Sequence, residues 1–208
     1  MLHSPADVAG IVDYARARGV RVVPEFDSPG HTFPSWGKGG PPELLTSCPS
    51  PSTDNTGPLR VDRPQTYEFL GGLLGEVAEK FPDEVFHGGG DEVRPDKQLS
   101  LSPPLSLPAF PSLPLSLSFP HTETIRPYGA QVSFGCWESN AEVKQWMATH
   151  GMGTNFTLLN NYYMTRLLAI IHDAAPRGVM NKTAMFWRPG AADTLTQSDI
   201  PAGTIFDV

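Results

Sequence analysis

Two adjacent carboxylates follow three consecutive glycines at the end of an apolar segment. The segment passes through Phe86 and His87 to the glycines at 88–90, and Asp91 and Glu92 come directly after them. Glycine allows the backbone to turn sharply and lets a ligand approach it closely. Adjacent residues of a regular strand point to opposite faces, so the two carboxylates are expected to have different roles. The pattern indicates a catalytic acid at a corner between strand and loop, and the alternative is a solvated surface turn that carries two acids.

The adjacency of the two carboxylates limits the chemistry that they could do. An ordinary retaining glycosidase needs two carboxyl groups about 5 Å apart across the sugar, and an inverting one needs them about 6.5–9.5 Å apart. A substrate-assisted enzyme instead needs one acid and a second carboxylate that orients the substrate's own nucleophile. The pair Asp91 and Glu92 fits this last arrangement best.

A second polar cluster follows another apolar segment nearer the N-terminus. Residues 20–32 are typical of a buried strand that runs into a polar loop, with Asp27 and His31 at its carboxyl end. A helix before this strand is indicated by Ser4 as its N-cap and Gly19 just past its end. The alternation of helix, strand and loop predicts a parallel sheet. In a (β/α)8 barrel, chemistry gathers where strands end and loops begin, and both polar clusters occupy that position.

Together, the two segments resemble the family 20 glycoside hydrolases, the β-N-acetylhexosaminidases. In that family the third barrel strand ends in a PEFD-(S/T)-PGHT motif and the fourth in HxGGDE, and residues 24–32 and 87–92 match these motifs in the same order. Further similarity is found at residues 44–48, in an expected helix at 67–81, at residues 136–140 and the expected helix after them, at Trp187, which ends the fifth strand, and at residues 202–208, which match the sixth.

The resemblance implies an α/β fold, namely a partial (β/α)8 TIM barrel that contains roughly strands 3 to 6. A complete barrel typically takes about 250 residues, whereas this chain has 208. On this alignment, strands lie outside the chain at both ends, so we expect a fragment of the catalytic barrel. Its first part is residues 1–93 and its second part is residues 133–208.

Residues 94–132 differ abruptly in composition from the segments on either side. They are rich in alternating leucine, serine and proline. Proline removes backbone donors and is excluded from helix interiors, so we expect a disordered or polyproline-like excursion. A structureless loop of this length is uncommon inside a compact domain, and joining Val93 to Ser133 restores the spacing of the family. We therefore hypothesise that this low-complexity insertion is translated intron or another artefact of the gene model, and not evolved protein.

The resemblance also implies roles for individual residues. Glu92 is implied to be the general acid/base that protonates the glycosidic oxygen and later takes a proton from water. The implied nucleophile is the carbonyl oxygen of the substrate's 2-acetamido group, with Asp91 accepting from the acetamido N–H. Trp187 is implied to form a wall of the sugar pocket. The other residues implied to bind substrate are His31, Asp27 and His87. Asp27 is implied to orient the His31 ring.

The chain departs from the family pattern at two places near this site. Arg188-Pro189-Gly190 follow Trp187 where family members usually have Gln-Glu, and Gly88 stands where a larger apolar residue is usual. The remaining tryptophans, Trp36, Trp137 and Trp146, are interpreted as packing aromatics.

Two alternatives to a hexosaminidase stay open at this stage. A metal-dependent hydrolase on the same barrel would use His31, His87, Asp91 and Glu92 as ligands. A chain that lacks part of the sugar-binding residues would instead be an inactive fragment or a carbohydrate-binding remnant. The hexosaminidase interpretation needs no cofactor and no metal.

Cysteines and glycosylation sequons suggest where the protein resides. Cys48 and Cys136 fall where the family has a loop-bridging disulfide, which implies an oxidising compartment, and two unrelated buried thiols are the alternative. The sequons at Asn155 and Asn181 are compatible with a secretory route. A lysosomal, vacuolar or secreted protein is expected from the resemblance, and no signal peptide begins this chain.

Composition excludes other classes of partner. The formal net charge is −7, and lysine and arginine do not cluster, which argues against nucleic acid. No apolar run reaches the roughly 20 residues that a membrane span requires. The implied partner is a glycan that contains N-acetylhexosamine, and family members often form homodimers at full length.

Overall fold

The computed structural model describes residues 3–32, 40–47, 56–90, 134–174, 181–188 and 191–207. The helices of this part are α1 (Pro5–Arg16), α2 (Pro64–Lys80), α3 (Gly135–Ser139), α4 (Ala141–Thr149) and α5 (Phe156–Asp173), with short 3-10 helices at Pro42–Leu44 and Ala191–Thr194. The strands are β1 (Leu45–Ser47), β2 (Thr56–Leu59), β3 (Val85–His87), β4 (Thr183–Trp187) and β5 (Ile205–Asp207).

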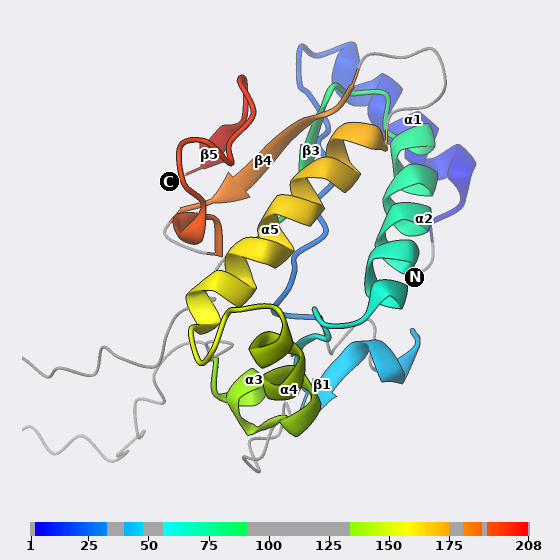
Figure 1. The fold of residues 1–208 in the computed structure, drawn as a ribbon. Coiled ribbons are helices and arrows are strands. Elements are labelled where there is room, and N and C mark those ends of the chain that lie inside the picture. Colours follow the sequence, from blue (N-terminus) through cyan, green and yellow to red (C-terminus); the bar gives the residue numbers. More distant parts are fainter. Residues whose placement is uncertain are drawn as a thin grey trace, which may run out of the picture.

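A parallel sheet lies at the centre of the fold, with its strands in the order β3-β4-β5 (Figure 1). Val85 pairs with Thr183, and Met185 pairs with Ile205. The strands follow one another in space as they do in sequence, and α5, the helix that precedes β4 in the chain, lies across one face of the sheet (Figure 1). The expectation of an α/β fold with a parallel sheet is confirmed. Within the described residues the sheet is open and does not close into a barrel.

The segment around Glu25 extends this sheet on the other side of β3. Glu25 forms a parallel bridge to His87. The Phe26 N–H donates to the His87 carbonyl at 3.1 Å, and the His87 N–H donates to the Pro24 carbonyl at 3.0 Å. The strand expected in residues 20–32 is therefore paired with β3 only at residues 24–26. This pairing fixes the position of the polar loop that follows it.

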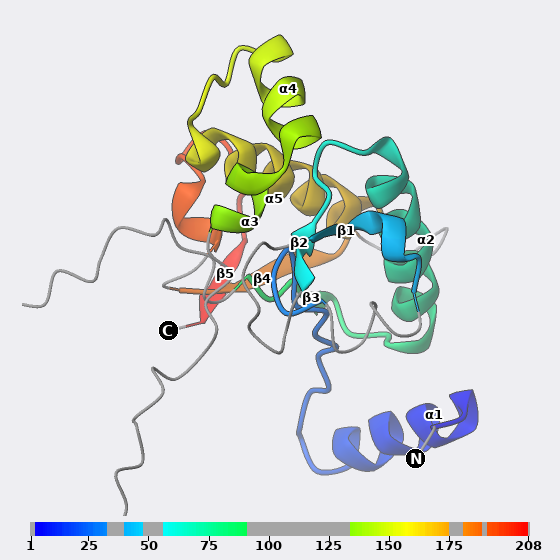
Figure 2. The ribbon, with the colours of Figure 1, turned by 90° about the horizontal axis from the view of Figure 1, so that it is seen from below.

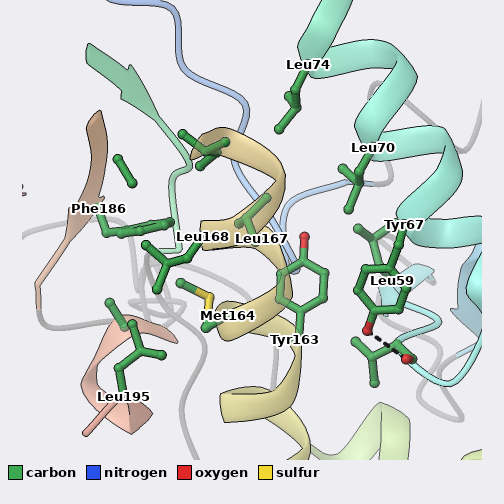
Figure 3. Close-up of a cluster of buried hydrophobic side chains, with 14 of the residues drawn as sticks. Leu59, Tyr67, Leu70, Leu74, Tyr163, Met164, Leu167, Leu168, Phe186 and Leu195 are labelled. Atoms are coloured by element: carbon green, nitrogen blue, oxygen red, sulfur yellow. Dashed lines mark hydrogen bonds between the residues drawn. The ribbon is translucent and has the colours of Figure 1, made fainter. Parts of the chain in front are cut away.

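The face of β4 that contacts α5 is apolar. Ala184 and Phe186 are buried, whereas Met185 and Trp187, which alternate with them, are only partly buried. Figure 3 shows Phe186 beside Leu168 of α5. The strand thus has one face packed on helices and one face, which includes Trp187, that the helices leave uncovered.

Helix α5 lies between the sheet and α2 (Figure 3). Its Met164 and Leu167 are buried, and so are Leu70 and Leu74 on the facing side of α2. These side chains recur at helical spacing along both helices, as expected for two amphipathic helices that share a core. The two long helices and the sheet therefore form one continuous hydrophobic core.

Helix α1 begins and ends as the sequence predicts. The Ser4 side chain and Asp7 form a reciprocal capping box, and Gly19 adopts a positive φ of 70° just beyond the helix. The helix buries none of its residues, and Tyr14 is 63% exposed. Figure 2 shows α1 set apart from the other helices. A bidentate ion pair from Arg21 to Asp83 ties the segment after it to the start of β3.

The short strands β1 and β2 form an antiparallel pair beside α3. Trp137 of α3 is fully buried, and its Nε1–H donates to the Leu59 carbonyl at 3.0 Å. The interpretation of Trp137 as a packing aromatic is confirmed, while Trp36 lies outside the described residues.

None of the helices in the described ranges combines the length and hydropathy that a membrane crossing needs.

The core between α5 and α2 predicts a large stability effect at Leu167. Leu167→Ala should lower the free energy of unfolding by about 2–5 kcal/mol, because a buried leucine loses both its transfer energy and its packing contacts. Leu158 on the same helix is 47% exposed, so Leu158→Ala is the matched control and should change it by less than about 0.5 kcal/mol. Urea titrations followed by circular dichroism measure both, and equal losses in the two variants would contradict this packing.

Candidate active site

The carboxyl ends of neighbouring parallel segments bring the polar residues together. Glu25 lies opposite His87 across the first pair of segments. The Trp187 N–H donates to the Gly89 carbonyl at 3.1 Å, which joins the end of β4 to the glycine turn after β3. On the outer side of β4, the Arg188 N–H donates to the backbone carbonyl at the end of β5 at 2.8 Å. The site is thus a row of strand ends held in register by backbone hydrogen bonds.

Asp27 connects the first polar cluster to the glycine turn. Its Oδ1 accepts the Gly90 N–H at 2.7 Å, and its Oδ2 lies 2.6 Å from the His31 Nδ1. His31 adopts a positive φ of 53°, which a non-glycine residue adopts only rarely. The expectation that Asp27 orients the His31 ring agrees with this contact. One carboxylate therefore holds both the histidine loop and the last described residue before Asp91.

Gly89 is the position at which the chain requires glycine. Its φ is 68°, and a Cβ placed on it would overlap the Cα and Oδ1 of Asp27. A side chain at this position would force the turn away from the carboxylate. The close approach of the glycine turn to Asp27 depends on the absence of that side chain.

His87 is buried beneath the turn and is only 5% exposed. The Gly89 N–H donates to its Nδ1 at 3.0 Å, so in the neutral ring the proton lies on Nε2. Burial lowers the pKa of His87, because the charged ring would lose its hydration. The Glu25 Oε1 lies 3.8 Å from the same Nδ1, but an Nδ1 that accepts a hydrogen bond cannot also donate one to Glu25. We therefore treat His87 as neutral and not as the ion-pair partner of Glu25.

Trp187 lies next to His87 and points to Glu25. Its ring centroid is 4.8 Å from that of His87, and its Nε1–H donates to the Glu25 Oε1 at 2.8 Å. Glu25 was not among the site residues expected from the sequence. Glu25 precedes Asp27 by two residues, and residues two apart on a strand share a face, which is the signal that could have identified it.

The structure shows what surrounds Gly88 and Arg188, which lie at the two departures from the family pattern. A Cβ on Gly88 would overlap the Phe186 ring and lie 3.1 Å from the Ile171 Cδ1, so the space of a larger residue is already filled. The Arg188 guanidinium lies 4.0 Å from the centre of the Phe206 ring. Phe206 pairs with Phe186 on the helix-covered face of the sheet, so Arg188 packs away from Trp187.

Several expected site residues lie outside the described ranges or remain untested. Asp91, Glu92 and Cys48 are outside the described residues, as is the 94–132 insertion. Cys136 is buried in α3, and its disulfide with Cys48 stays a prediction.

Both sequon asparagines lie at the surface. Asn155 is the N-cap of α5, and its side-chain oxygen accepts the backbone N–H groups of Thr157 and Leu158. Asn181 is exposed, and its side-chain nitrogen lies 2.7 Å from the His172 Nε2. Glycosylation of either residue stays a prediction.

No group of three or more histidine, cysteine or acidic side chains in the described part of the chain could hold a metal ion. Of the four ligands that a metal-dependent hydrolase would use, His31 and His87 are described. In each the Nδ1 is already engaged, with Asp27 and with the Gly89 N–H respectively.

Comparison with known proteins identifies the family. The model of the glycosyl hydrolase family 20 catalytic domain matches residues 1–200. The β-hexosaminidase subunit beta of Homo sapiens is 34% identical over 209 residues, which cover 100% of this chain and 29% of the human protein. The β-hexosaminidase subunit alpha of Bos taurus is 33% identical over 172 residues, which cover 82% of this chain and 25% of the bovine protein. The chain thus spans less than a third of these relatives.

Solved structures agree on the fold. The chitobiase of Flavobacterium johnsoniae superposes with a TM-score of 0.60 at 21% identity, over 98% of this chain and 24% of the chitobiase. The β-N-acetylhexosaminidase of Bacteroides fragilis gives a TM-score of 0.59 at 19% identity, over 99% of this chain and 31% of that enzyme. With the strand-end motifs, the family match and the shared fold all in agreement, the chain belongs to glycosyl hydrolase family 20.

Proposed function

We propose that this chain is part of a β-N-acetylhexosaminidase that hydrolyses terminal non-reducing N-acetylhexosamine residues of glycans. The proposed mechanism retains the anomeric configuration and uses the substrate's acetamido group as nucleophile. Membership of family 20 supports this function, as do relatives that carry the name β-hexosaminidase.

The observation that carries the proposal is the contact between Asp27 and the glycine turn. Gly90 is fixed to the Asp27 carboxylate, and Gly89 has room only for a hydrogen in place of a side chain. Asp91 and Glu92 are the next two residues in the chain. A turn anchored this closely supports a role for these carboxylates that depends on position, since catalytic groups must be held to within a fraction of an ångström.

In the proposed reaction, Glu92 donates its proton to the glycosidic oxygen as the bond to the anomeric carbon breaks. The acetamido carbonyl oxygen forms the new bond to that carbon, which gives a cyclic oxazolinium ion, and Asp91 accepts a hydrogen bond from its N–H. Water then attacks the anomeric carbon, loses a proton to Glu92, and the ring opens to restore the acetamido group. Trp187 forms a wall of the sugar pocket, and His31, Asp27 and His87 lie at its edge.

We further propose that residues 24–26, β3, β4 and β5 are strands 3 to 6 of a (β/α)8 barrel. The parallel order and the fold shared with family 20 structures support this assignment. The uncovered face of β4 would then be part of the barrel interior. The protein would act on glycans in the lysosome, in the vacuole or outside the cell, and would form a homodimer at full length.

One observation favours a second candidate function. Trp187 is held by Glu25 and His87 on the face of β4 that the helices leave uncovered, and an ordered indole can bind a sugar without hydrolysing it. A carbohydrate-binding remnant of the family is therefore the alternative.

Turnover of a chromogenic substrate separates the two functions, and the Glu92→Gln variant tests the assignment of the acid. The protein to be tested lacks residues 94–132 and carries the flanking barrel strands of the human subunit beta at both ends. We expect it to hydrolyse a chromogenic N-acetyl-β-glucosaminide. In that protein Glu92→Gln should lower kcat about 10²–10⁴-fold, because the glutamine cannot transfer the proton.

The control is Glu79→Gln on the exposed side of α2, which should leave kcat unchanged. Full activity of the Glu92→Gln variant would contradict the assignment of the acid. Binding of N-acetylglucosamine without turnover in every version would support the carbohydrate-binding remnant.

The anchored turn generates its own prediction. Gly89→Ala should lower kcat about 100-fold, because the turn must shift away from Asp27 and displace the residues after it. Gly151→Ala is the matched control, since Gly151 has a φ of 71° but no heavy atom within 4 Å of its added Cβ. That variant should lose only the roughly 1–2 kcal/mol of a left-handed backbone and keep its kcat. Thermal unfolding and steady-state kinetics distinguish the two, and equal kcat values would contradict the role of the Asp27 contact.

A further inference from the structure

Glu25 has no role in the proposed reaction, yet it lies among the residues that do. It is at the carboxyl end of its paired segment, and its side chain is 40% exposed. Its Oε1 accepts the Trp187 Nε1–H at 2.8 Å. The two residues belong to segments that flank β3 on opposite sides, so the hydrogen bond crosses the strand that leads to Asp91 and Glu92.

Three contacts together determine where the Trp187 indole lies. The backbone N–H of Trp187 donates to the Gly89 carbonyl. This hydrogen bond fixes the position of the Trp187 backbone beside the glycine turn. The His87 ring lies against the indole, with centroids 4.8 Å apart. The backbone hydrogen bond does not restrict the side-chain torsions, and a ring contact is less directional than a hydrogen bond. The hydrogen bond from Nε1 to Glu25 sets the direction in which the indole N–H points.

The chemistry of Glu25 suits this task. A carboxylate is an acceptor only, and the indole Nε1–H is a donor only, so the pair is complementary. A hydrogen bond to a charged acceptor is shorter and stronger than one between neutral groups. Neutral His87 does not compete for Glu25, because its Nδ1 accepts from the Gly89 N–H.

We propose that Glu25 is a positioning residue that holds the Trp187 indole in the orientation required to bind the sugar. The inference rests on the proposed function for the identity of the ligand. The hydrogen bond itself does not depend on it. Glu25 acts through Trp187 and does not exchange a proton with the substrate.

The orientation of Trp187 can be measured without any activity. The protein is labelled with 5-fluorotryptophan, and Trp187→Phe identifies the fluorine resonance of Trp187. Glu25→Ala should shift and broaden this resonance, because the indole loses its acceptor. Glu25→Gln should keep it close to the wild-type position, because the amide oxygen also accepts a hydrogen bond. Glu79→Ala, on the outer side of α2, is the control and should leave it unchanged.

Kinetics on an N-acetyl-β-glucosaminide then link the orientation to function. Glu25→Ala should lower kcat/KM about 100-fold, since a shift of the pocket wall near 1 Å misplaces the sugar. Glu25→Gln should recover most of this loss, and the pH profile should keep its shape, because Glu25 transfers no proton. An unshifted Trp187 resonance in Glu25→Ala, or a glutamine variant as impaired as the alanine variant, would overturn the proposal. These kinetics use the protein from which residues 94–132 are removed and to which the flanking strands are added. If that protein hydrolyses nothing but the resonance moves as expected, the proposed function fails and the positioning role stands.

Discussion

The Asp27 carboxylate accepts hydrogen bonds on both of its oxygens, and the arrangement of the site depends on this. One oxygen binds the Gly90 N–H and the other meets the His31 ring. These partners come from different parts of the chain, so Asp27 holds two loops at once. The contact forms only if residues 24–26 pair with β3 in the observed register, because a slip of one residue would turn Asp27 to the other face of the sheet. The pairing of residues 24–26 with β3 therefore determines whether the Asp27 carboxylate can reach the glycine turn.

The register is maintained by the core behind the sheet. Phe186 fills the space beside Gly88, and Ile171 of α5 packs against the same point. Helix α5 in turn packs on α2 through fully buried side chains (Figure 3). Helix α5 packs directly on β4, α2 supports α5 from the other side, and the strand ends carry the polar residues. A rigid scaffold with functional residues at its loop ends is the usual way in which such folds keep geometry while varying chemistry.

Local features of this fold could be predicted from the sequence, and contacts between distant segments could not. The caps of α1 depend on residues within a single turn, so Ser4 and Gly19 identified them. The pairing of Asp27 with His31 is also local, at a separation of four residues. Glu25 was missed because its partner Trp187 lies 162 residues away. Likewise, the filling of the space beside Gly88 by Phe186 depends on the register between β3 and β4, which the sequence alone does not define.

The most direct test of the central claim compares two substrates that differ only at the sugar's second carbon. In the proposed mechanism the acetamido carbonyl acts as the nucleophile, so the nitrophenyl N-acetyl-β-glucosaminide should be hydrolysed on the order of 10³-fold faster, or more, than the nitrophenyl β-glucoside. The glucoside has a hydroxyl group in place of the acetamido group and cannot form the cyclic ion. Similar kcat/KM values for the two substrates would show that the protein supplies its own nucleophile and would contradict the account.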